Sequence, residues 1–443
     1  MMMVYKRIFL LIVILFFYLI IPSDVYALDY KNGHFEKINT DYHLGMPVQF
    51  NDGRVFIISD DNIINFDPNT NKFKKIATLN TSINKHDNTK AIGLNKNKIL
   101  FIAPLFKEPS EQFEHEIYWL ILNDLYKYKS LYFRDKNIKT TRDAWRAYKQ
   151  LPEIEREKIY LPYLKKDPDL IKKYYDYIED YKKSMYAQLF DINSYNFEYT
   201  GKLNLRRSNS KKVLLKDGSV LLFGGFVQRD NSIPIGISDS GVSRKASVFE
   251  VYNPDTNKFS LIKSPKIFNN INDLYLYNDN LLIVADNRFY LYNLKTNNLR
   301  ESKSEVNGKT FLQLKNGDIV LVSYVSDKLG NQMILKRYNP EKDTIVELGK
   351  LIVPRGSVYL YNMTLLPDGN ILVNGGQNIE KSGNFSGDGI YENRTEIFNP
   401  ETGKSVLIKN MPYKRPGGYS VLLKDGRILF YFDKYACLYV PRK

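Results

Sequence analysis

The stretch VLLKDGSVLLFGG, residues 213–225, consists of an apolar segment, an Asp-Gly pair and a second apolar segment. The pattern returns as LLPDGNILVNGG at 365–376 and as VLLKDGRILF at 421–430. Asp-Gly and Asn-Gly pairs tolerate the positive φ that a two-residue hairpin turn demands, so each copy predicts a β-hairpin. Weaker copies bring the number to seven; they lie at Asp52-Gly53, Asn95 to Asn97, Asp279-Asn280 and Asn316-Gly317.

A second motif follows most copies of the first. It is YNPDTNKF at 252–259, with relatives at 66–73 (FDPNTNKF), 190–197 (FDINSYNF), 292–296 (YNLKT), 338–340 (YNP) and 398–402 (FNPET). Asn or Asp followed by Pro and a small polar residue is typical of a turn between two strands. Two hairpins per repeat make a four-stranded antiparallel blade, and blades arranged around an axis make a propeller.

The seventh copy of the second motif is split between the two ends of the chain. The C-terminal segment stops at YVPRK, residues 439–443, where that turn should begin. NGHFEKI at 32–38 matches TNKFKKI at 70–76 of the first complete copy. We therefore expect the N-terminal segment to supply the outer strand of the last blade and to close the ring, which removes an exposed sheet edge.

Together these motifs resemble the repeat of the kelch propellers of the galactose-oxidase-like kind. The resemblance rests on an Arg before the inner strand, Leu-x-Asp-Gly, a Gly-Gly doublet and Tyr-Asn-Pro-x-Thr-x-x-Phe, and it covers residues 28–104 and 187–443. Phe73 and Phe259 stand where that family usually has Trp, and only blades three and six keep the doublet. The resemblance implies an all-β fold: a seven-bladed kelch-type β-propeller closed by an N-terminal strand.

The β pattern stops over residues 105–186, where helical spacing predicts an α-helical insertion in blade two. Thr140 and Asp143 are spaced as at a helix start. The segment holds both tryptophans, Trp119 and Trp145. Two interpretations stay open: a small helical cap whose aromatic side chains pack on the propeller, or a partner-binding subdomain, since aromatic residues are favoured at interface centres.

Residues 1–27 have the three parts of a secretory signal. Lys6 and Arg7 precede an apolar run from Ile8 to Ile21, and small residues stand three and one positions before Leu28. The run is shorter than the roughly 20 residues of a membrane span. We expect a cleaved signal and a secreted or extracytoplasmic protein, with an uncleaved N-terminal anchor as the alternative.

The composition limits the classes of partner that we expect the protein to bind. The 443 residues carry 64 Lys+Arg against 49 Asp+Glu, a formal charge of +15, with no basic stripe of interleaved aromatics, so nucleic acid is not an expected partner. The charge favours association with anionic envelope polymers or a membrane surface, or it serves solubility alone. One Cys (Cys437) excludes a disulfide scaffold, and we expect a monomer.

Strand order indicates which face of the propeller we expect to carry the function. With strands named a to d outward from the axis, the Asp-Gly and Asn-Pro turns share one face, and the b–c and d–a connections share the other, called the b–c face below. The helical insertion and the Gly/Ser-rich segments Phe226 to Lys245 and Gln377 to Arg394 are long b–c connections. Length beyond what closure needs is commonly functional.

Three arginines precede inner strands on that face: Arg207, Arg355 and Arg415. Their guanidinium forks are candidate ligands for a carboxylate, sulfate or phosphate. The alternative is that each arginine ties neighbouring loops through backbone carbonyls.

The sequence predicts no catalytic residue, no cofactor and no metal site. The copper site of the galactose-oxidase-like enzymes needs two His, two Tyr and a crosslinked Cys, whereas all four His here precede blade three. His43 is the one histidine near an inner strand, and we expect an exposed loop residue rather than a base. Asp52, Asp217, Asp368 and Asp425 are turn residues on the opposite face.

The predicted function is a non-enzymatic exported binding module, which takes a protein through the helical insertion (Trp119, Trp145) or an anionic glycan through Arg207, Arg355 and Arg415. The alternative is a carbohydrate-active enzyme of the kelch mutarotase kind, acting in the central channel.

Overall fold

The computed structural model describes most of the chain beyond the predicted signal. The described residues are 28–50, 52–59, 62–79, 91–95, 97–102, 113–127, 138–205, 207–208, 210–228, 235–236, 243–246, 248–306, 308, 310–327, 330–378, 391–414 and 418–443. Residues 1–27, on which the signal prediction falls, lie outside them. Within the described ranges no helix is both long and apolar enough to cross a membrane.

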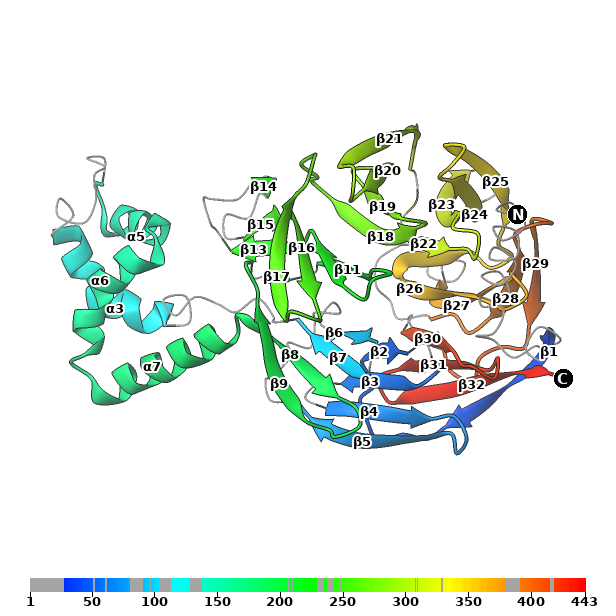
Figure 1. The fold of residues 1–443 in the computed structure, drawn as a ribbon, viewed down its shortest axis with the longest axis horizontal. Helices are drawn as coiled ribbons and strands as arrows, with labels where there is room; N and C mark the ends of the chain where they lie inside the picture. Colours follow the sequence, from blue (N-terminus) through cyan, green and yellow to red (C-terminus); the bar gives the residue numbers. More distant parts are fainter. Residues whose placement is uncertain are drawn as a thin grey trace, which may run out of the picture.

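Seven four-stranded antiparallel sheets surround a central axis and form a closed ring (Figure 1). From the axis outward, blades one to three are β2 (Met46–Gln49), β3 (Val55–Ser59), β4 (Asn62–Asp67), β5 (Lys72–Thr78); β6 (Ala91–Leu94), β7 (Lys98–Phe101), β8 (Tyr186–Asp191), β9 (Phe197–Lys202); and β11 (Lys211–Leu214), β12 (Val220–Phe223), β16 (Val248–Asn253), β17 (Lys258–Lys263). The predicted seven-bladed all-β propeller is confirmed.

The other four blades follow in chain order. Their strands are β18 (Ile271–Tyr277), β19 (Asn280–Ala285), β20 (Arg288–Asn293), β21 (Asn298–Glu305); β22 (Thr310–Gln313), β23 (Ile319–Asp327), β24 (Gly330–Asn339), β25 (Thr344–Lys350); β26 (Arg355–Leu365), β27 (Ile371–Asn378), β28 (Thr395–Asn399), β29 (Lys404–Ile408); and β30 (Tyr419–Leu422), β31 (Ile428–Phe432), β32 (Tyr435–Arg442), β1 (Asp29–Ile38).

The b–c connection of blade three, together with the segment before its strand a, contains strands that the sequence did not predict. They form a small sheet of β10 (Arg207–Ser208), β13 (Phe226–Gln228), β15 (Ser243–Ala246) and β14 (Ile235–Gly236).

The Asp-Gly turns are three-residue loops, which corrects the two-residue turns predicted above. The Leu215 amide donates to the Ser219 carbonyl at 2.8 Å, so Lys216, Asp217 and Gly218 form the loop. Of these three residues, only Gly218 has a positive φ, 86°. The Asp217 carboxylate accepts from the Ser219 amide at 2.9 Å, and this bond keeps Asp217 in an ordinary backbone conformation.

In the copies of the second motif that begin with tyrosine, the hydroxyl of that residue ties the turn. The sixth residue of the motif has positive φ, as at Asn257 (54°) and Asn297 (58°). The Tyr252 hydroxyl donates to Asn257 Oδ1 at 2.8 Å, and the Tyr292 hydroxyl donates to Asn297 Oδ1 at 2.7 Å. The Tyr at the first position of the motif therefore fixes the turn as well as filling the core.

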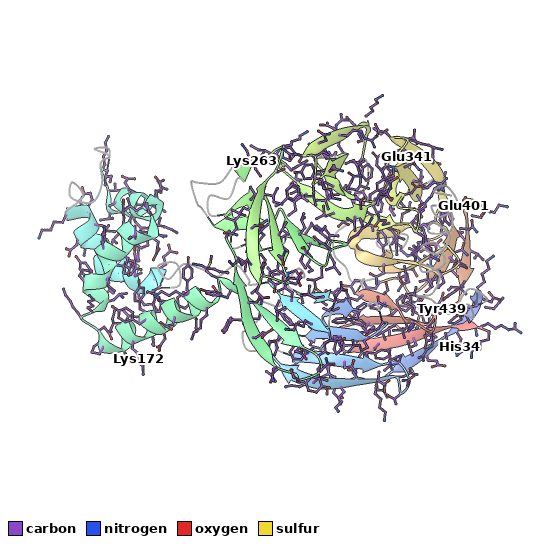
Figure 2. The ribbon with its side chains drawn as sticks, viewed as in Figure 1. His34, Lys172, Lys263, Glu341, Glu401 and Tyr439 are labelled. Carbon is purple, nitrogen blue, oxygen red and sulfur yellow. The ribbon has the colours of Figure 1, made fainter. Side chains whose placement is uncertain are left out.

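The two ends of the chain close the ring as predicted. β1 pairs antiparallel with β32 from Asp29↔Arg442 to Ile38↔Ala436. Figure 2 shows His34 and Tyr439 on these two neighbouring strands. The Tyr30 hydroxyl donates to the Gly426 carbonyl at 2.8 Å, which anchors β1 to the Asp-Gly turn of the same blade.

The chain between β7 and β8 forms a separate helical unit, defined here as α3 (Glu114–Lys127), α5 (Thr141–Gln150), α6 (Glu153–Leu164) and α7 (Pro168–Lys183). Figure 1 shows the unit beside the ring, with α7 running into β8. α5 begins at the predicted helix start, where Thr140 and Asp143 form a capping box. The helices bury a core of their own, which includes Ile117, Tyr148 and Tyr160.

Two glycines allow a matched test of how the blades interlock. An added Cβ at Gly403, in the c–d turn of blade six, would lie 2.1 Å from the Leu348 carbonyl of blade five, whereas Gly369 has nothing within 4 Å. Both have positive φ (69° and 86°), so alanine strains both backbones alike. We expect Gly403→Ala to lower the melting temperature by several degrees more than Gly369→Ala in thermal unfolding. Equal losses would contradict this interlock.

Candidate functional site

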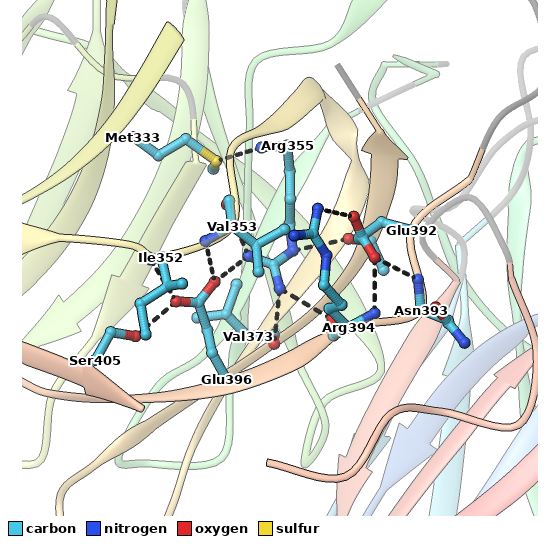
Figure 3. Close-up of polar contacts among 11 residues, drawn as sticks. Met333, Ile352, Val353, Arg355, Val373, Glu392, Asn393, Arg394, Glu396 and Ser405 are labelled. Carbon is cyan, nitrogen blue, oxygen red and sulfur yellow. Dashed lines mark hydrogen bonds and ion pairs between the residues drawn. The ribbon is translucent and has the colours of Figure 1, made fainter. Parts of the chain in front are cut away.

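Arg355, predicted as an anion ligand, is fully buried inside blade six (Figure 3). Its guanidinium pairs with the Glu396 carboxylate. Nε donates to the Gly375 carbonyl at 2.9 Å and Nη2 to the Arg394 carbonyl at 3.0 Å. An added Cβ at Gly376 would meet the Arg355 side chain at 2.9 Å, so the Gly-Gly doublet gives the arginine its room.

Arg207 has the same environment in blade three. Nη2 donates to Glu250 Oε2 at 3.2 Å, and Nη1 donates to the carbonyls of Gly224 and Val248 at 3.1 and 3.2 Å. Burial lowers the pKa of Arg207, although the Glu250 charge opposes the shift. Burial raises the pKa of Glu250, opposed by the Arg207 charge and by the Asn204 amide. Each partner therefore offsets part of the other's desolvation.

These contacts correspond to the alternative interpretation, in which the arginines tie loops through carbonyls. Arg207 and Arg355 lie in different blades, and the structure does not bring them together. An external anion would have to displace a buried glutamate to reach either guanidinium. Arg415, the third predicted ligand, lies outside the described residues.

Glu250 and Glu396 were not predicted from the sequence, although the sequence holds a signal for them. Each is an acidic residue in an otherwise apolar strand, two positions before the aromatic residue of the second motif. Blades three and six are also the blades with both an inner-strand Arg and a Gly-Gly doublet. In blade seven the matching position is Cys437, which is buried. Arg, Gly-Gly and Glu therefore form one structural set.

A second acidic residue, Glu392, lies at the b–c end of blade six. The Glu392 carboxylate accepts from the amides of Asn393 (3.0 Å) and Arg394 (2.9 Å) and from Arg394 Nη2 (2.7 Å). Burial favours the neutral acid, but the hydrogen bonds from Arg394 outweigh it and lower the pKa of Glu392. Figure 3 shows this group beside the Arg355 pair.

The two tryptophans of the helical unit have different roles. Trp145 stacks on Tyr148 with ring centroids 4.9 Å apart and packs against the helical core. Trp119 is 70 % exposed, and its Nε1 lies 3.4 Å from His115 Nε2 on the same helix. Trp145 therefore packs on the unit's own core and not on the propeller, as the cap interpretation required, whereas Trp119 faces solvent.

A cavity of about 500 Å³ lies along the central channel beside the inner strands of blades one to three. Its lining includes Phe50, Leu94 and Leu214, with Asp52 and Asn97 at the Asp-Gly end. The size suits a small ligand. Hydrogen bonds from Arg54 lower the pKa of Asp52, so this carboxylate is a weak proton acceptor.

His43 is exposed, as expected, and its Nδ1 contacts the Asp433 carboxylate. The predicted turn residues Asp217, Asp368 and Asp425 each accept the amide of the second residue after them. Among the described residues no group of three or more His, Cys, Asp or Glu could hold a metal ion.

The comparisons with known proteins support the fold alone. No protein-family model matches the sequence, and no curated protein matches it. A solved fungal alcohol oxidase of the AA5 family, in complex with copper, is similar with a TM-score of 0.53 and 12 % identity over 92 % of this chain and 76 % of that chain. A streptogramin B lyase structure is similar with a TM-score of 0.50 and 10 % identity over 94 % and 99 %.

The copper of that oxidase has no matching donor set among the described residues. Cys437 is buried in β32, where it packs with Phe430 and Tyr439 of the blade core. His34 and His115 lie on β1 and α3, and His43 is paired with Asp433. These side chains do not converge, so no reaction through copper is derived for this chain.

The Arg355–Glu396 pair predicts an asymmetry in stability. Glu396→Gln removes the charge opposite a buried guanidinium, and breaking a buried pair costs about 3–5 kcal/mol. Glu401→Gln is the control, because Glu401 pairs with Arg337 at the surface, where a pair is worth about 0–1 kcal/mol. Urea denaturation should give a much lower midpoint for Glu396→Gln. Similar midpoints for the two variants would show that the buried pair does not hold blade six.

Proposed function

We propose that this chain is an exported kelch-type β-propeller that acts as a non-enzymatic binding module and takes a protein partner through its helical unit. The observation that carries the proposal is Trp119, 70 % exposed on a unit that has its own core. Exposed tryptophans are favoured anchors of interfaces. The unit is a b–c connection far longer than blade closure requires.

Several features of the sequence support this setting. The signal-like residues 1–27 favour export, and the Arg, Gly-Gly and Tyr-Asn-Pro motifs favour the kelch repeat. The net charge of +15 favours a place near an anionic envelope polymer or membrane surface and does not require nucleic acid. The ring closes on itself, so we propose a monomer. An anionic glycan is a further ligand of the same face.

Photo-crosslinking tests the protein partner. A benzophenone amino acid replaces Trp119 in the full chain, and the matched control replaces Val346, an exposed residue (45 %) of the outer strand β25. In cells that export the protein, irradiation should give a discrete protein adduct from position 119 and none from position 346. Added wild-type chain should compete the adduct away, whereas a Trp119→Ala chain should not.

Two outcomes contradict the proposal. One is an adduct pattern that is the same from both positions. The other is competition by Trp119→Ala that equals competition by the wild type, because Trp119 would then contribute nothing to binding.

The channel cavity favours a second candidate, a carbohydrate-active enzyme of the mutarotase kind. Its volume of about 500 Å³ suits a monosaccharide. The test is anomer equilibration of freshly dissolved N-acetylneuraminic acid, followed by proton NMR with wild type and with buffer alone. This candidate requires faster equilibration with wild type than in buffer. A rate equal to that in buffer excludes it for this sugar.

A further inference from the structure

The b–c turn of blade seven presents aromatic side chains to solvent. β31 ends at Phe432 and β32 begins at Tyr435; these side chains are 38 % and 52 % exposed. The two residues are directly paired across the strands, so their side chains lie on one side of the sheet. Tyr413, from the connection between blades six and seven, packs on Tyr435 with ring centroids 5.1 Å apart.

The same turn carries a fixed polar pair. His43 Nδ1 contacts Asp433 Oδ1, and the two side chains are 56 % and 44 % exposed. The Leu44 amide donates to the Asp433 carbonyl at 3.0 Å, so the segment with the histidine is held against the turn. With Nδ1 engaged by the carboxylate, the other ring nitrogen is available to a partner from outside.

Positive charge borders this group. Lys37 Nζ lies 5.3 Å from the centre of the Tyr413 ring. Lys434 stands between Asp433 and Tyr435 in the turn and is exposed. The carboxylate of Asp433 is already paired with His43.

We propose that this group (Lys37, His43, Tyr413, Phe432, Asp433, Lys434 and Tyr435) binds a carboxylate-bearing sugar of an anionic glycan. A tyrosine ring offers an apolar face for the C–H face of a sugar and a hydroxyl for its rim. The His43–Asp433 pair offers a donor and an acceptor to sugar hydroxyls, and the lysines attract the sugar carboxylate.

A glycan fits these groups better than a protein interface. The exposed rings lie beside charged groups, Tyr413 beside Lys37 and Tyr435 beside Lys434, whereas the centres of protein interfaces are depleted in charged residues. The inference rests on the proposal that the b–c face binds ligands. It places the glycan on blade seven instead of on Arg207 and Arg355, whose guanidinium groups are occupied by Glu250 and Glu396.

Calorimetry with the full exported chain tests the site. The probes are an oligogalacturonate, sialyllactose and a neutral maltooligosaccharide of similar length. We expect wild type to bind at least one acidic probe and to bind the neutral one at least tenfold more weakly. Tyr435→Ala should weaken acidic-probe binding by about tenfold, because the stacking ring is lost. Asp433→Asn should weaken acidic-probe binding about threefold, because it alters the His43–Asp433 pair. The backbone should be kept, since asparagine tolerates the positive φ of 52° at this position.

The matched control is Tyr199→Ala. Tyr199 is 53 % exposed on the outer strand β9. The Tyr199→Ala variant should bind the probes as wild type does. Equal melting temperatures of the variants confirm that folding is intact. The inference is overturned if Tyr435→Ala binds like Tyr199→Ala, if the neutral probe binds as well as the acidic ones, or if wild type binds neither acidic probe. The Trp119 adduct does not depend on Tyr435, so a failure here is distinguishable from a failure of the protein-partner proposal.

Discussion

The pairing of β1 with β32 is the constraint on which the whole ring depends. Each blade buries both faces against its neighbours, so a ring that lacks one strand leaves an unpaired edge and loosens every interface. Tyr30 and Tyr439, 409 residues apart, are joined through the Tyr439 hydroxyl and the Tyr30 carbonyl. Closing so long a chain costs little more than closing a shorter one, because loop entropy grows slowly with length.

The buried Arg–Glu pairs stabilise the two blades that have long b–c connections in the propeller itself. A buried pair is weak evidence for stability, because desolvation offsets much of the attraction. Its geometry is specific, however: Arg355 binds the Gly375 and Arg394 carbonyls from both sides of the b–c connection. The pair therefore ties the end of strand b to the start of strand c, and the Glu392 amide continues the contact by donating to the Gly376 carbonyl at 2.8 Å.

Much of the fold was predictable from the sequence, because a repeated motif reports the same turn several times. The blade count, the closing strand and the helix start at Thr140 followed from the spacing of residues. The site was less predictable. The exposure of an arginine depends on its partner, and Glu250 lies 43 residues from Arg207, so the pair becomes visible only when the blades are aligned on one another. The separate core of the helical unit depends on which faces its helices bury, and helical spacing alone left both interpretations of the insertion open.

The two faces of the propeller differ in whether their side chains already bind neighbouring blades. On the Asp-Gly face, turns of neighbouring blades bind one another: Arg427 donates to Asn71 Oδ1 at 2.8 Å, and Arg300 donates to the Pro340 carbonyl. Side chains that hold the ring together cannot vary without cost to stability. On the b–c face, the Arg–Glu pairs lie beneath the surface, whereas the side chains of Tyr435 and Trp119 are more than half exposed. Such a division lets one face maintain the ring while the other is free to take on ligands.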